Sequence, residues 1–127
     1  MPATPNDSDW TILGALWERG QYTAPKIAEA LSGERGWAYS TVKTMLDRMV
    51  KKELVRGRQV GSVWEYTAAV EPDQARRTAW QRFIGAAFGG ATAPALRFIA
   101  NDAKLTKRER DLLRRMLEES TTREGAE

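Results

Sequence analysis

The middle of the chain carries polar side chains at a helical spacing. They are Ser40, Lys43, Thr44, Asp47, Arg48 and Lys51. Residues three and four apart share one face of a helix, and the residues between them form an apolar face: Val42, Met45, Leu46, Met49 and Val50. Hydroxyl and charged groups on one face can hydrogen-bond to base edges in the major groove, while cations pair with phosphates. The spacing therefore predicts a helix with the chemistry to bind DNA; the alternative is a face that is only solvated.

Positive charge gathers around the same segment. From Lys43 to Arg58 there are six basic and two acidic residues, a net charge of +4, whereas all 127 residues together carry +3. The rest of the chain therefore carries a net −1. Binding to a nucleic acid depends on cations that cluster where the phosphates lie. This clustering favours double-stranded DNA as the partner.

Residue types that many enzymes need are missing. The chain has no cysteine and no histidine, which excludes disulfides, thiol catalysis and Ser-His-Asp triads and leaves zinc without its usual ligands. Gly85, Gly89 and Gly90 lack the Gly-Lys-Ser/Thr of a phosphate-binding loop. We therefore expect no enzymatic activity, no cofactor and no metal. Since no apolar run approaches the ~20 residues of a membrane span, we expect a cytoplasmic protein without membrane insertion.

Three helices and a hairpin are expected to position the polar face. Apolar periodicity and capping residues predict helices over residues 9–19, 24–33 and 39–53, the first capped by Asp7 or Ser8 and the second by Thr23. After Leu54 the side-chain pattern repeats every two residues instead of every three or four. This alternation predicts strands over residues 54–59 and 63–67 around a turn at Val60-Gly61-Ser62. The fold class is mainly α with a small β-hairpin wing. Residues 1–70 are predicted to form a winged helix-turn-helix domain that binds DNA.

Three more helices are expected in residues 71–127, the last starting with a capping box from Thr106 to Glu109. So small a piece holds more large apolar side chains than it can bury alone. This predicts a C-terminal helical domain that forms a homodimer; packing on the winged helix of the same chain is the alternative. The predicted dimerisation residues are Trp80, Phe83, Ile84, Phe88, Leu96, Leu112, Leu113, Met116 and Leu117. The last four lie on the final helix, which is expected to bury them.

A family resemblance covers about residues 8–119. The run from Ser40 to Val55, with its Thr41-Val42-Lys43-Thr44 core, looks like the recognition helix of the penicillinase repressor family, of the BlaI/MecI/CopY type. The family pattern also includes Trp10 and Trp17 in the first helix and Phe88-Gly89-Gly90 at the end of the fourth. The resemblance implies a homodimeric repressor of an operator, with an N-terminal winged helix and a C-terminal helical dimerisation domain. A palindromic operator is the expected partner.

The predicted DNA contacts fall into two groups. Contacts to base edges or close to them are expected from Tyr39, Ser40, Thr41, Lys43 and Thr44. Of these, the resemblance places Lys43 and Thr44 where the family contacts bases. Contacts to phosphates or from the wing are expected from Arg48, Lys51, Arg56 and Arg58.

The resemblance also implies a membrane sensor metalloprotease that relieves repression by triggering a cut in the dimerisation domain. The family's cut lies between an Asn and a Phe, and the matching bond here is Phe98–Ile99, without the Asn. The copper-responsive branch carries C-terminal cysteine pairs, so copper sensing through them is excluded. Two alternatives stay open: a ligand-sensing winged-helix regulator of another family, and a winged helix used only for protein–protein assembly.

Overall fold

The computed structural model describes residues 3–126, and the side chains of Glu34 and residues 121–126 lie outside that description. The chain forms two compact units, Met1–Arg82 and Phe83–Glu127. The helix α4 (Pro72–Phe88) contributes to both of them. The assignment of DNA binding to residues 1–70 and of dimerisation to residues 71–127 stays a prediction.

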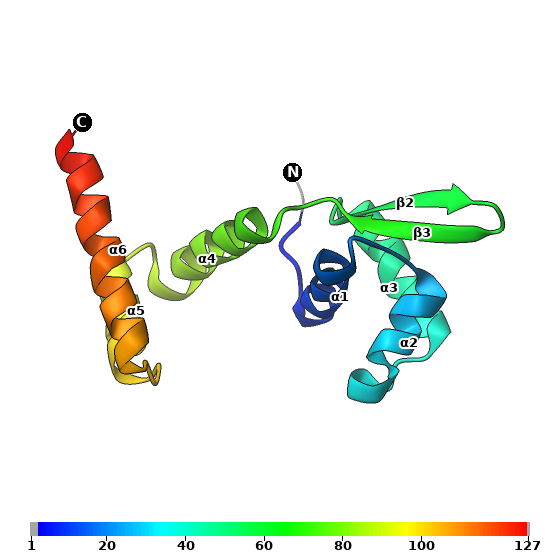
Figure 1. Ribbon diagram of the computed structural model, residues 1–127, viewed down its shortest axis with the longest axis horizontal. Coiled ribbons are helices and arrows are strands. Elements are labelled where there is room, and N and C mark those ends of the chain that lie inside the picture. Colours follow the sequence, from blue (N-terminus) through cyan, green and yellow to red (C-terminus); the bar gives the residue numbers. More distant parts are fainter. Residues whose placement is uncertain (1–2, 127) are drawn as a thin grey trace. The chain divides into compact units, whose positions relative to one another are not determined.

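The first unit has the element order of a winged helix (Figure 1). Its elements before α4 are α1 (Asp7–Arg19), β1 (Gln21–Thr23), α2 (Ala24–Arg35), α3 (Tyr39–Lys51), β2 (Val55–Val60) and β3 (Val63–Ala68). The antiparallel β2–β3 hairpin, which we call the wing, projects from the helices as a two-stranded arm. The predicted mainly α fold with a small β-hairpin wing is confirmed.

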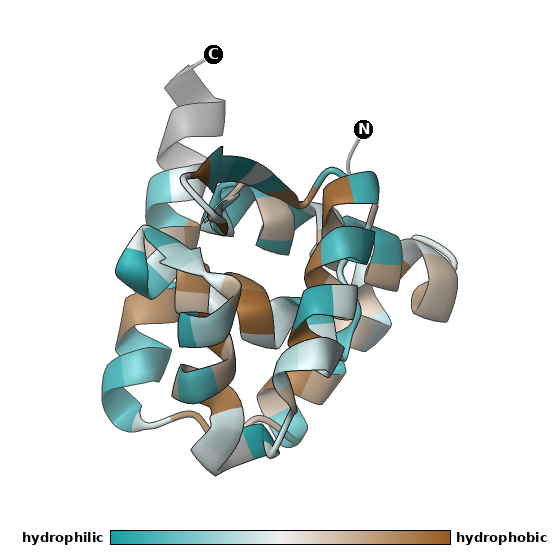
Figure 2. Ribbon diagram, turned by 90° about the vertical axis from the view of Figure 1, so that its right-hand side faces the viewer, coloured by the Kyte–Doolittle hydropathy of each residue, from teal (hydrophilic) through white to brown (hydrophobic). Residues whose placement is uncertain are grey.

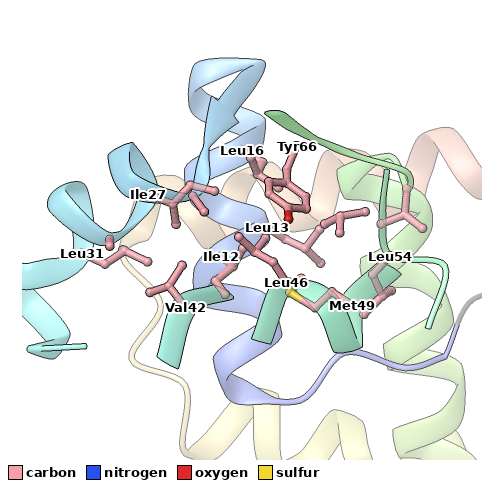
Figure 3. Packing of buried hydrophobic residues seen from close by; sticks show 14 of the residues in the cluster. Ile12, Leu13, Leu16, Ile27, Leu31, Val42, Leu46, Met49, Leu54 and Tyr66 are labelled. Carbon is pink, nitrogen blue, oxygen red and sulfur yellow. The ribbon is translucent and has the colours of Figure 1, made fainter. Parts of the chain in front are cut away.

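One apolar cluster joins the three helices to the sheet. In Figure 3, Val42, Leu46 and Met49 of α3 face side chains of α1 and α2, among them Ile12. Tyr66 of β3 belongs to the same cluster. Burying an apolar side chain such as Leu46 contributes about 1.5–3 kcal/mol to the stability of the fold. The cluster therefore fixes how α3 is rotated about its own axis.

The starts and ends of α1 and α2 follow local signals, with two corrections. α1 begins after Asn6 and not after Asp7 or Ser8, because Asn6 and Asp9 form a reciprocal capping box with N···O distances of 2.8 and 3.0 Å. α2 begins after Thr23 as predicted but runs past residues 32–33 to Arg35. Its end is set by Gly36, whose φ of 65° supplies the left-handed residue that closes a helix.

The sheet contains a third strand that the sequence did not predict. β1 is three residues long and pairs antiparallel with β3, so that the strand order is β1-β3-β2. So short a strand has no periodicity of its own, and it is held by its partner. In the hairpin Val60 pairs with Val63, and the turn is Gly61-Ser62, one residue shorter than predicted. Gly61, with a φ of 64°, supplies the positive φ that tight hairpins need.

The second unit holds the end of α4, α5 (Thr92–Asn101) and α6 (Lys107–Ala126). Gly89 and Gly90, with φ of 59° and 87°, end α4 as predicted. The capping box is confirmed, since the Thr106 and Glu109 backbone N–H groups each donate to the other's side chain, at 2.9 and 3.1 Å. Over the described residues no single helix is long and apolar enough to cross a membrane, although α4 and α5 taken as a bent pair meet that criterion.

The burial predicted for the final helix is wrong for the single chain. The apolar residues of α6 are 41–59% exposed: Leu112, Leu113, Met116 and Leu117. Of the described residues in the second unit, only Ile84 and Ala95 are buried. Figure 2 shows apolar segments recurring along the helices. The unit is too small to enclose them, because a short chain buries a small fraction of its surface.

Candidate DNA-binding surface

The apolar face of α3 holds the helix so that its polar face is turned outward. Val42, Leu46 and Met49 are fully buried, and Met45 packs against the same cluster. Val50 differs from the prediction, because 42% of its surface is exposed. The buried residues lie one or two turns apart along the helix, so the whole length of α3 is anchored.

The end of α3 leads directly into the wing. The helix stops at Lys51, two residues before its predicted end, and Glu53 takes a φ of 64°. The Leu54 N–H then donates to the Met49 carbonyl at 2.9 Å. This bond turns the chain into β2, and so the wing follows α3 after only three residues.

Six of the predicted DNA contacts lie exposed on α3: Tyr39, Ser40, Thr41, Thr44, Arg48 and Lys51. The Thr44 hydroxyl donates to the Ser40 carbonyl at 3.0 Å. The oxygen of that hydroxyl keeps its lone pairs, so it can accept from a base. Hydroxyl groups and two cations of α3 are therefore accessible from solvent.

Lys43 is turned toward the wing. Its Nζ donates to the Tyr66 hydroxyl at 2.6 Å and to Asp47 Oδ1 at 3.1 Å. The same atom lies 5.8 Å from the centre of the Trp64 ring and 5.4 Å from that of Tyr66, within the range of cation–π attraction. The ammonium group therefore connects α3 to β3.

These contacts raise the pKa of Lys43. The main cause is the hydrogen bond to Tyr66; partial burial opposes it, and the hydrogen bond to Asp47 adds to it. The pKa is raised in the folded state. The contacts of charged Lys43 therefore stabilise the fold fully at pH values below the ordinary lysine pKa of 10.5, and this contribution is lost as the pH rises through the folded-state pKa. The lysine stays charged throughout the neutral range.

The wing presents its two predicted cations on the face that points away from α3. Arg58 pairs with Glu65 across the hairpin, so it shares a face with Arg56 and lies opposite Trp64 and Tyr66. Both arginines are exposed. Arg58 lies 3.3 Å from the Glu65 carboxylate, but exposed ion pairs contribute little. Arg58 can therefore exchange this partner for a phosphate.

The other face of the wing brings two aromatic rings against β2. A Cβ atom at Gly57 would lie 3.2 Å from Tyr66 Cε1 and 3.4 Å from Trp64 Cε3. Any side chain there would push against the rings that stand beside Lys43. Glycine at position 57 therefore allows the contact between α3 and the wing.

One cation of the charge cluster is used inside the fold. Lys52 Nζ lies 2.8 Å from Asp9 Oδ2, and Asp9 is buried. A buried carboxylate without a partner is strongly destabilising. Lys52 therefore ties α1 to the end of α3, and less charge faces DNA than the net +4 of the sequence suggests.

The residues predicted for dimerisation and cleavage have mixed exposure. Ile84 is buried and Phe88 half-buried, whereas the other dimerisation residues are exposed: Trp80, Phe83, Leu96, Leu112, Leu113, Met116 and Leu117. The Phe88 ring lies 5.6 Å from that of Phe83 and 5.9 Å from that of Phe98. Phe98 is exposed and Ile99 is half-buried. The three rings connect the end of α4 to α5.

Tyr66 and Asp47 were missed as partners of Lys43. The spacing of Lys43 and Asp47, four residues apart on a helix, is a signal that sequence alone could have used. Tyr66 lies 23 residues farther along the chain. Only the pairing of the sheet and the docking of α3 bring its hydroxyl to the lysine.

Comparison with known proteins gives one family over most of the chain. The family model described as penicillinase repressor matches residues 6–119. The penicillinase repressor of Bacillus licheniformis is 24% identical over 119 residues, which cover 93% of this chain and 92% of that protein. An uncharacterized 16.5 kDa protein of Latilactobacillus sakei is 32% identical over 74 residues, 58% of this chain, and the match spans 51% of that protein's length. The solution structure of the DNA-binding domain of the repressor BlaI matches with a TM-score of 0.49 and 26% identity, covering 57% of this chain and 90% of that one.

Replacing Tyr66 by Phe should lower the pKa of Lys43, because the change removes the hydroxyl acceptor and keeps the ring. Asp47→Asn should lower it less, since that hydrogen bond is the smaller contribution. NMR titration of the lysine side-chain resonances measures both shifts against the wild type. A pKa of Lys43 that is the same in Tyr66→Phe and the wild type would contradict the contact.

Proposed function

The chain belongs to the penicillinase repressor family, and we propose that it is a transcriptional repressor that binds double-stranded DNA. The observation that carries this proposal is the outward polar face of α3, which a buried apolar face fixes beside the wing. A helix of this kind fits the major groove, where base edges differ. The name of the Bacillus licheniformis relative, a penicillinase repressor, supports repression as the result of binding.

The exposed residues divide by chemistry into base contacts and phosphate contacts. The hydroxyl-bearing residues of α3 are suited to base edges: Tyr39, Ser40, Thr41 and Thr44. The exposed cations of α3 and the wing are suited to phosphates: Arg48, Lys51, Arg56 and Arg58. Contacts of the second kind set the register on the duplex, and those of the first kind carry the sequence preference.

The two alternative functions have less support. A ligand-sensing regulator needs an enclosed pocket. Within the described residues, the apolar cavity beside Leu54, Val70 and Ala75 holds about 80 Å³, against roughly 300 Å³ for common ligand sites. The larger hollows, of about 470–630 Å³, are more open to solvent. A module used only for protein assembly has no need of clustered, solvated cations, since charged residues are depleted at the centres of protein interfaces. DNA is the partner that uses them.

Binding to DNA should be selective in sequence and steep in salt. The full chain is incubated with a pool of random duplexes, and the sequences it enriches define its operator. If each subunit of a dimer pairs about four cations with phosphates, about eight are neutralised, and log K against log salt has a slope of about −7.

The salt slope can be tested residue by residue. Replacing both Arg56 and Arg58 by Gln removes about four phosphate contacts from a dimer, and the slope should become shallower, about −4. Arg108→Gln on α6 is the matched control and should leave the slope unchanged. A wild-type slope shallower than about −2, or a pool in which no sequence is enriched, would count against DNA binding.

The repressor acts as a homodimer on a palindromic operator. Exposed apolar side chains on α5 and α6, including Leu96 and Leu113, support an interface with a second copy, because the second unit buries so little by itself. A two-fold dimer presents the same patch from both chains and doubles the core. Two winged helices related by that axis would contact two inverted half-sites.

Leu113→Glu should convert the dimer to a monomer, since it places a charge in the proposed interface. Sedimentation of the full chain gives the mass directly. Arg114→Glu adds the same side chain at the next position of α6 and should leave the dimer intact. A dimer that survives Leu113→Glu and Met116→Glu together would place the interface elsewhere.

Repression is relieved by a cut at the Phe98–Ile99 bond, made in response to a membrane sensor metalloprotease. Two features of α5 support this site: the helix is ten residues long, and its N-cap, Ala91, makes no side-chain hydrogen bond, so local opening is cheap. The cut would detach α6 and its apolar residues. Cells treated with a cell-wall antibiotic should then yield a fragment of residues 1–98 by mass spectrometry, and derepression with the chain intact would refute the cut.

A further inference from the structure

An acidic side chain lies on α3 among the predicted DNA contacts. Asp47 lies one turn after Lys43 and one turn before Lys51 on α3, and 59% of its side chain is exposed. A carboxylate there repels phosphates, so it weakens the sequence-independent part of DNA binding. The ion pair with Lys43 offsets part of this cost, and a contact between the carboxylate and a hydrogen-bond donor on a base edge would offset more of it.

The carboxylate of Asp47 is connected to the wing through Lys43. Its Oδ1 accepts from Lys43 Nζ at 3.1 Å, and the same Nζ is fixed on the wing by the Tyr66 hydroxyl at 2.6 Å. A carboxylate offers about four acceptor sites, so one bond to Lys43 leaves room for a base. The contact with β3 thus limits the movement of a side chain that is otherwise exposed.

We propose that Asp47 reads a cytosine in each half of the operator and that Lys43 is the residue that positions it. The inference rests on the DNA-binding function proposed above. In the major groove, guanine offers acceptors and thymine an acceptor and a methyl group, so neither suits a carboxylate. Adenine pairs its N6 donor with an N7 acceptor that repels a carboxylate, whereas the cytosine amino group at N4 is a donor alone.

Lys43 supports the contact between Asp47 and cytosine in two ways. Its charge offsets that of Asp47 locally, which lowers the repulsion between the carboxylate and the phosphates nearby. Its hydrogen bonds orient the carboxylate before DNA arrives, so less conformational freedom is lost on binding. Lys43 is therefore a positioning residue, and its loss should act at the base that Asp47 contacts.

Base preference in random duplex pools, measured with the full chain, tests the inference. The wild type should prefer cytosine at one position of each half-site by about 5-fold, the lower end of the range for base contacts, because the contact is a single hydrogen bond. Asp47→Ala should abolish that preference and leave the other positions unchanged. Asp47→Asn should move it to adenine, because an amide can pair with both N6 and N7.

Three further variants separate positioning from general effects of charge. Lys43→Met and Tyr66→Phe should weaken the preference at that same position, with circular dichroism confirming that the helices are retained. Glu29→Gln on the exposed face of α2 also removes one negative charge, and it should leave the preference as in the wild type.

The outcomes distinguish this inference from the function on which it rests. If the wild type enriches no sequence, DNA binding itself is wrong. If the wild type and Asp47→Ala enrich the same sequences, the reading of cytosine by Asp47 is wrong while the repressor function stands. If Lys43→Met changes the preference at a different position, Lys43 contacts a base itself and the positioning role is overturned.

Discussion

The burial of one face of α3 is the constraint on which the rest of the candidate DNA-binding surface depends. Val42, Leu46 and Met49 lie in the apolar cluster with no exposed surface. A slip of one residue would rotate the helix by roughly 100° and bring charged side chains such as Asp47 toward the core. Since burying an unpaired charge costs several kcal/mol, the cluster selects a single rotation. The polar row faces outward because no other arrangement of this sequence keeps the charges in water.

The parts of the fold that local patterns specify could be predicted from the sequence, and those that need a distant partner could not. Periodicity located α3, and the Thr106–Glu109 capping box located the start of α6. β1 was missed because its hydrogen bonds come from β3, more than forty residues later. The exposure of the polar residues of α3 followed from the helical spacing. The direction of Lys43 did not, because it depends on the Tyr66 hydroxyl.

The two units differ in how far they bury their apolar side chains. In the first, three helices and a sheet surround one cluster, in which Ile12, Leu13 and Ile27 have no exposed surface. In the second, the described residues bury only Ile84 and Ala95, so most apolar surface stays in contact with water. The ring contacts of Phe88 with Phe83 and Phe98 hold the end of α4 to α5 without forming a core. An apolar surface of this extent is typical of a chain that completes its core by association.

The cations of the central segment are divided between the fold and the surface, and counting lysines and arginines hides this division. Lys52 neutralises the buried Asp9, and Lys43 is held between Asp47 and Tyr66. Each therefore fixes α3 against a neighbouring element, Lys52 against α1 and Lys43 against the wing. Arg56 and Lys51 are exposed, so their charge is available to a phosphate. Part of the positive charge of this segment therefore holds α3 in its orientation, because Lys52 and Lys43 connect the helix to its neighbours, and only the remaining cations are left for an anionic partner.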